Sequence, residues 1–119
     1  MILVLPFPDP ALMPNRKNGH HWTKTNTVKK RAIHEAYMLT KAHGPMVVEN
    51  GLQITFYTPT NHRRDNDNLL AAMKPYLDGF AQALKIDDTN FNPLVIKRVD
   101  GVGKANARVE IESLGDNDG

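Results

Sequence analysis

Two pairs of closely spaced aspartates are the residues of this 119-residue chain whose types and spacing best suit chemistry. Asp65 and Asp67 directly follow Arg63 and Arg64, and the second pair occupies positions 87 and 88. Mg²⁺ binds carboxylate oxygens in proteins, usually one or two carboxylates together with water and substrate phosphates. Neighbouring carboxylates repel one another unless a cation lies between them. The two pairs therefore predict a Mg²⁺ site made of aspartates, with Mn²⁺ as a substitute.

A metal site of this kind beside positive charge is suited to the hydrolysis of a phosphodiester. The metal would polarise the phosphate, activate a water molecule and stabilise the leaving oxygen. Arg63 and Arg64 can bind the phosphate, because a guanidinium group pairs with phosphate through two parallel hydrogen bonds. An alternative stays open, in which Asp65 and Asp67 only cap a helix N-terminus. In that alternative the two arginines simply balance the charge of the aspartates.

The net charge of +2 hides a basic front and an acidic end. Residues 15–43 hold seven Lys or Arg side chains and one acid, whereas residues 109–119 hold four acids and no Lys or Arg. A basic stretch of this density is typical of a surface that binds a polyanion, although a solvated helix face is the alternative. Besides Arg63 and Arg64, the candidate contacts to a polyanion such as DNA are Asn15, Arg16, Lys17, Lys24, Lys29 and Lys30.

Length and composition exclude several classes of protein. A chain of 119 residues suits one small domain. With 40% hydrophobic and 24% charged residues, the sequence is typical of a globular protein and not of a disordered chain. Cysteine is absent, which excludes disulfides, thiolate zinc sites and cysteine nucleophiles. No apolar run approaches the ~20 residues of a membrane span, so we expect a cytoplasmic protein without a membrane partner.

Two helices are expected from capping residues and apolar periodicity. The first is capped by Thr25 or Thr27 and runs to about residue 42, before a Gly-Pro pair. The second covers residues 68–84, since its apolar residues recur every three or four positions: Leu69, Met73, Leu77, Phe80 and Leu84. The two aspartate pairs thus flank the second helix, one pair at its start and the other just beyond its end.

Four strands complete the expected fold. We place them at residues 2–7, 52–57, 94–99 and 107–111, and expect residues 101–104 to join the last two as a hairpin. The result is a single α+β domain over residues 1–119, with a mixed sheet packed against two main helices in the order β-α-β-α-β-β. Residues 113–119 are expected to form a frayed acidic tail.

The spacing of the aspartates resembles the RusA family of Holliday junction resolvases. The resemblance lies in an Asp-x-Asp-Asn-Leu string that opens a helix, at residues 65–69, and in an Asp-Asp pair about twenty residues later. The front loop is also similar, through Phe7, Pro8, Pro14, Asn15 and Arg16, and the resemblance covers nearly the whole chain. It implies a homodimeric, Mg²⁺-dependent endonuclease of DNA recombination and repair that cuts four-way junctions symmetrically. Many members of the family are carried by phages or prophages of bacteria.

The resemblance also assigns roles to individual residues. It places the catalytic, metal-binding aspartates at Asp65, Asp67 and Asp88. The family uses a catalytic lysine four residues after the second aspartate, and this chain has Ala71 there. Lys74 lies two helical turns beyond Asp67, on the same helix face, and is the candidate replacement. The alternative for Lys74 is an ordinary solvated lysine.

Three functions remain open from the sequence. The leading one is a Holliday junction resolvase that makes paired nicks in four-way or branched DNA. The second is a broader nuclease for flaps, forks or single strands, with the same aspartates. The third is a DNA-binding accessory protein without catalytic activity, whose aspartates only cap a helix.

Chain length indicates which subunit supplies Asp88. A helix over residues 68–84 is about 25 Å long, whereas the four residues that follow it span at most ~14 Å. Asp88 can therefore join Asp65 and Asp67 of its own chain only if the helix is bent or shortened, with Pro75 as the obvious place. We expect instead that Asp88 comes from the partner subunit of a homodimer, which gives two composite sites related by a two-fold axis.

Overall fold

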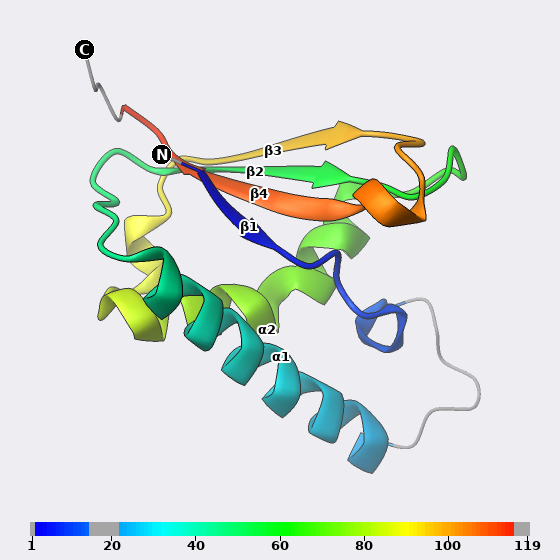
Figure 1. The fold of residues 1–119 in the computed structure, drawn as a ribbon, viewed down its shortest axis with the longest axis horizontal. Helices are drawn as coiled ribbons and strands as arrows, with labels where there is room; N and C mark the ends of the chain where they lie inside the picture. Colours follow the sequence, from blue (N-terminus) through cyan, green and yellow to red (C-terminus); the bar gives the residue numbers. More distant parts are fainter. Residues whose placement is uncertain (1, 15–21, 116–119) are drawn as a thin grey trace.

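In the computed structural model, two helices pack against one face of a four-stranded mixed sheet (Figure 1). The structure describes residues 2–14 and 22–115, without the side chains of residues 22–24. The strands are β1 (Ile2–Leu5), β2 (Leu52–Tyr57), β3 (Leu94–Val99) and β4 (Arg108–Ser113). The helices are α1 (Trp22–His43) and α2 (Asn66–Leu84), and the expected α+β fold is confirmed.

The order of the strands in the sheet is β1-β4-β2-β3. The β2 and β3 strands are parallel and are connected through α2, whereas β4 runs antiparallel to both β1 and β2. The predicted hairpin between the last two strands is therefore wrong. The physical reason is burial: β4 carries Val109 and Ile111, both 0% exposed, and takes a central place, while the second half of β3 is exposed at the edge.

Some expected element boundaries also change. The first strand ends at Leu5 and not at residue 7, since prolines at positions 6, 8 and 10 cannot donate backbone hydrogen bonds to a ladder. The first helix begins at Trp22, upstream of the expected threonine cap. Ser113 is a buried end of β4 and not part of a frayed tail. Residues 116–119 of the expected tail lie outside the described part of the chain.

The core lies between the sheet and the two helices. The predicted apolar stripe of α2 is confirmed: Leu69, Met73 and Phe80 are at most 1% exposed, and Leu77 is also buried. The helices cross closely at Gly79, where an added Cβ would lie 2.1 Å from the carbonyl oxygen of Ile33 on α1. This close approach fixes α2 against α1.

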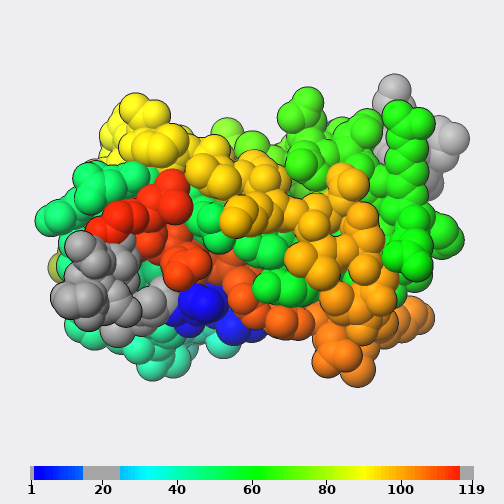
Figure 2. All heavy atoms as spheres, turned by 90° about the horizontal axis from the view of Figure 1, so that it is seen from above, coloured from blue at the N-terminus to red at the C-terminus, as the bar shows by residue number. Residues whose placement is uncertain are grey.

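On the side of the sheet that faces away from the helices, the strands form the surface of the molecule (Figure 2). Ile2 and Val4 of β1 are about half exposed there, at 46% and 50%. On the same side, the Tyr57 hydroxyl donates a hydrogen bond to Glu110, and the Arg108 guanidinium lies 3.9 Å from the centre of the Tyr57 ring. Among the described residues, no helix has the length and apolar character needed to cross a membrane.

Candidate metal and nucleic-acid site

Asp65 occupies the N-cap position of α2, yet its side chain makes no capping hydrogen bond. Its backbone has the extended conformation usual for an N-cap, and its carbonyl oxygen accepts the first helical bond from the amide of Leu69. The exposed carboxylate is therefore left for other partners. The capping alternative is wrong for the Asp65 side chain. Asp67 lies in the first turn of the same helix and is also exposed.

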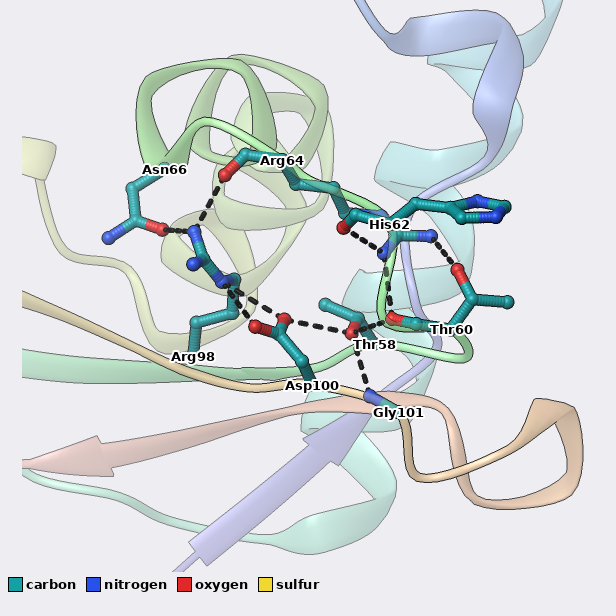
Figure 3. A network of polar contacts seen from close by, with 8 residues as sticks. All are labelled: Thr58, Thr60, His62, Arg64, Asn66, Arg98, Asp100 and Gly101. Atoms are coloured by element: carbon teal, nitrogen blue, oxygen red, sulfur yellow. Dashed lines mark hydrogen bonds and ion pairs between the residues drawn. The ribbon is translucent and has the colours of Figure 1, made fainter.

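Arg98 of β3 binds both sequence neighbours of Asp65, the backbone of Arg64 and the side chain of Asn66 (Figure 3). Its Nη1 atom donates to the carbonyl oxygen of Arg64 at 2.7 Å and to Oδ1 of Asn66 at 2.9 Å. Its Nε atom donates to a carboxylate oxygen of Asp100 at 3.1 Å. Arg98 is thus a positioning residue for Asp65: it connects the start of α2 to the end of the sheet.

The other end of this network is anchored in the core. The Thr58 side chain at the end of β2 is buried, and its hydroxyl lies 3.0 Å from Oδ1 of Asp100. The same hydroxyl contacts the carbonyl oxygen of Thr60 and accepts a hydrogen bond from the amide of Gly101. Sequence reasoning missed Arg98 and Asp100. The only signal was an Arg-x-Asp spacing at the end of a strand, which by itself indicates no more than a surface ion pair.

The two arginines before Asp65 differ in their contacts. The Arg64 guanidinium donates to the carbonyl oxygens of Thr60 and His62 at 3.0 and 3.2 Å, and to the Thr60 hydroxyl at 2.9 Å. None of these partners is a carboxylate, so Arg64 stabilises the loop before α2 through neutral acceptors. Arg63 is exposed. A phosphate contact stays a prediction for both residues, and Arg63 has the more accessible side chain.

A cleft of about 690 Å³ lies beside Asp65. It brings the segment after β1 next to the start of α2, because Phe7, Pro8 and Met13 line it together with Asp65 and Arg63. The front segment and the aspartate motif, far apart in the sequence, are thus neighbours in space. The next residues of the front loop, namely the candidate DNA contacts Asn15, Arg16 and Lys17, lie outside the described residues.

The remaining candidate DNA contacts lie on α1. Lys29 and Lys30 are both exposed there. Lys24 is in the first turns of the same helix, and its side chain is not described. The exposure of the two lysines is compatible with phosphate contact and equally with a solvated face.

The second aspartate pair follows the other end of α2. The helix ends at Lys85 in the left-handed conformation (φ 58°), and a short 3-10 helix, η2 (Asp88–Asn90), begins three residues later. Asp87 caps this turn: its Oδ1 accepts from the amide of Thr89 at 3.3 Å, and its own amide donates to the side chain of Asn90 at 3.2 Å. The 3-10 turn therefore has the helix cap that α2 lacks.

The two carboxyls of this pair act on one another. The pKa of Asp88 is raised, first by its hydrogen bond with Asp87 and then by the negative charge of that neighbour. The positive charge of Lys74 opposes this rise, and Asp78 adds to it. The pKa of Asp87 is lowered by the same hydrogen bond and by the amide of Thr89. Lys74 is exposed, and its charge acts on Asp88, so it lies on the side of α2 nearer to the second pair.

One chain does not bring the two aspartate pairs together. The α2 helix continues through Pro75 without interruption, so its 19 residues extend over about 28 Å. Within residues 2–14 and 22–115, no group of three or more Asp, Glu, His or Cys side chains could hold a metal ion. A helix shortened at Pro75 is therefore wrong, and the described part of one chain does not bring Asp88 together with Asp65 and Asp67.

Comparison with known proteins finds a bacterial relative of the chain. Over 110 residues, which is 86% of this chain and 71% of the relative, it is 38% identical to an uncharacterized protein of Xylella fastidiosa. The chain belongs to the family of this Xylella protein, whose name states no activity. A scan against models of protein families found no match.

Proposed function

We propose that this protein is a Mg²⁺-dependent endonuclease that cuts branched DNA, with the four-way Holliday junction as its substrate. The observation that carries the proposal is the carboxylate of Asp65, which lies at a helix N-cap and makes no capping bond. A helix N-terminus that leaves such an acid uncapped forgoes the stabilisation of about 1 kcal/mol that an N-cap side chain usually provides. A ligand for that carboxylate is the physical reason for this arrangement.

The donor set of Asp65 and Asp67 fits Mg²⁺, which needs only one or two carboxylates beside water and phosphate oxygens. Bound at these residues, Mg²⁺ would supply the positive charge that polarises the phosphodiester and the acidity that activates a water molecule. The protein itself supplies position. Arg98 holds the two residues that flank Asp65, and Arg64 holds the loop before it. Arg63, exposed beside the cleft, is the residue suited to binding the phosphate.

In the proposed enzyme, the partner subunit supplies Asp88. One chain holds its two aspartate pairs at opposite ends of an unbroken α2, so a site that needs both pairs has to use two chains. A two-fold dimer then has two identical composite sites, which suits paired nicks in a symmetric junction. Lys74, whose charge acts on Asp88, would enter the site with it. DNA recombination and repair in the bacterial cytoplasm is the process in which such an activity is used.

Cleavage of labelled DNA tests the proposal. The purified protein is mixed with a four-way junction, a fork, a flap and a linear single strand, each with Mg²⁺, with Mn²⁺ and with EDTA. We expect metal-dependent, symmetric nicks in the junction alone. Cutting of flaps or linear single strands would show a nuclease of broader specificity. Binding without cutting in every metal would show a DNA-binding accessory protein and overturn the proposal.

A further inference from the structure

The lining of the cleft beside Asp65 has two chemical characters. Its volume of about 690 Å³ lies in the range of pockets that hold one small organic molecule or one nucleotide. The apolar lining is formed by Phe7, Pro8, Pro10, Met13, Pro59 and Leu69. The polar lining is formed by Arg63, Arg64, Asp65 and Asn68.

This combination is unusual for a site that meets only paired DNA. A duplex presents phosphates and sugars to a protein, and the apolar faces of its bases are covered by stacking. A site that holds an extruded nucleotide instead packs the base face against apolar and aromatic side chains and reads the base edge through hydrogen bonds. The cleft has groups for each part: an apolar lining with Met13 for the base face, Arg63 for a phosphate, and Asn68, whose amide both donates and accepts, for the base edge.

We infer that the cleft binds one unstacked nucleobase of the substrate DNA, next to the phosphodiester held at Asp65. The inference rests on the proposed nuclease function and adds to it the recognition of a single nucleotide. A branch point suits this recognition, because a base leaves the stack most easily where pairing is already disturbed. The cleft then favours junctions over linear duplexes through the cost of unstacking, in addition to any effect of overall shape.

Fluorescence of 2-aminopurine tests the inference directly, because stacking quenches this base analogue. The analogue is placed in turn at each nucleotide around the mapped cut. The junction is then bound by Asp67→Asn protein, which we expect not to cut it and whose change lies outside the cleft. We expect the fluorescence to rise several-fold at one position and to stay low at the others. A Met13→Ser change in the same protein should reduce the rise. Quenched fluorescence at every position would overturn the inference.

A matched pair of methionine variants gives the second test. Met13→Ser should weaken junction binding about fivefold, which is the lower limit of the loss expected when a base no longer stacks on an aromatic side chain. Met38→Ser is the control, since Met38 lies on α1, is 52% exposed and does not line the cleft. The position where 2-aminopurine fluorescence rises is called the responsive position. On a junction with an abasic site there, wild type and Met13→Ser should bind equally, because two changes that remove the same interaction are not additive. An equal weakening by Met13→Ser on both junctions would contradict the inference.

A change on α2 keeps the test valid if Met13→Ser does not fold. Asn68→Ala should abolish the preference of wild type for one base at the responsive position, measured as the ratio of junction affinities with each of the four bases there. An unchanged base preference would count against the inference. The nicking assay separates its failure from that of the proposed function. Wild-type protein that nicks junctions while these tests are negative refutes the cleft alone, whereas absence of nicking in Mg²⁺ and Mn²⁺ refutes the nuclease.

Discussion

The two ends of α2 carry the same kind of residue in different structural roles. Asp65 and Asp87 each precede a helical segment and occupy its N-cap position. Asp87 uses its carboxylate as a cap, with both bonds of a capping box around η2. Asp65 precedes the much longer helix and makes no such bond. The Asp87 carboxylate thus has a structural use within its own turn and the Asp65 carboxylate has none, which is the difference on which the proposed metal site rests.

The two ends also differ in what supports them. The start of α2 is held by Arg98, Asp100 and Thr58, which connect the backbone around Asp65 to the buried end of β2. The contacts of the acidic pair beyond the helix stay within its own turn: Asp87 binds Thr89 and Asn90, and the hydrogen bond with Asp87 raises the pKa of Asp88. In the proposed enzyme the first end is preorganised for a metal, and the second brings negative charge that a cation relieves.

The largest expected effect comes from removing single carboxylates at either end. Asp65→Asn, Asp67→Asn and Asp88→Asn should each lower cleavage by more than the ~10–100-fold typical of residues that only support metal ligands. Each should keep or tighten junction binding, because it also removes repulsion of the phosphates. Asp78→Asn is the control at the second end, since Asp78 is an exposed neighbour of Asp88 outside the proposed metal site. Loss of binding in all three variants with a normal fold would contradict the metal site.

A smaller effect is expected from the support of the first end. Arg98→Gln should raise the Mg²⁺ concentration for half-maximal cleavage about tenfold, as changes in supporting residues do. The control is Arg108→Gln, because Arg108 makes a similar Arg-x-acid pair with Glu110 at 2.7 Å and contacts no residue at the start of α2. Arg98→Lys should recover part of the loss. If Arg98→Gln and Arg108→Gln shift the Mg²⁺ concentration for half-maximal cleavage equally, Arg98 has no positioning role and only forms a surface ion pair.

The smallest effect concerns the basic face of α1. Replacing Lys29 and Lys30 by glutamine should flatten the dependence of log affinity on log salt by up to about one unit for each phosphate that the protein no longer binds. Lys41→Gln is the control on the same helix, about 16 Å further along. Junction binding is measured in EDTA over a range of salt concentrations. A salt slope equal to that of wild type would assign the two lysines to a solvated face.

Local pattern predicted most of the elements and failed on their pairing. The strand at residues 52–57 and the buried stripe of α2 follow from alternation and helical spacing, which the chain carries within short windows. The pairing of β4 with β1 and β2 depends on contacts between residues 51 to 110 positions apart, from Tyr57–Arg108 to Ile2–Glu112, and a glycine-containing turn before β4 indicated a hairpin instead. Sequence proximity was the misleading signal there.

In the candidate site, too, the sequence predicts what depends on local spacing and not what depends on contacts between distant segments. The aspartate pairs and their separation are arithmetic on positions and helix rise, so the sequence was sufficient for both. The free carboxylate of Asp65 and the bonds of Arg98 to its neighbours depend on how β3 lies beside the start of α2. No residue type or spacing encodes that contact, so the positioning network could be found only in three dimensions.

Subunit mixing tests most directly the central claim, that the two ends of α2 from different chains form one metal site. Asp65→Asn and Asp88→Asn proteins, each inactive alone, are exchanged into heterodimers and given junction DNA with Mg²⁺. If the site is shared, both changes in a heterodimer fall in the same one of its two sites, and the other site is intact. About half of the dimers in an equal mixture are heterodimers, so the mixture should regain about a quarter of the wild-type nicking. A mixture of Asp65→Asn with Asp67→Asn is the matched control and should stay inactive. Verified heterodimers of Asp65→Asn and Asp88→Asn that produce no nicks would contradict the shared site.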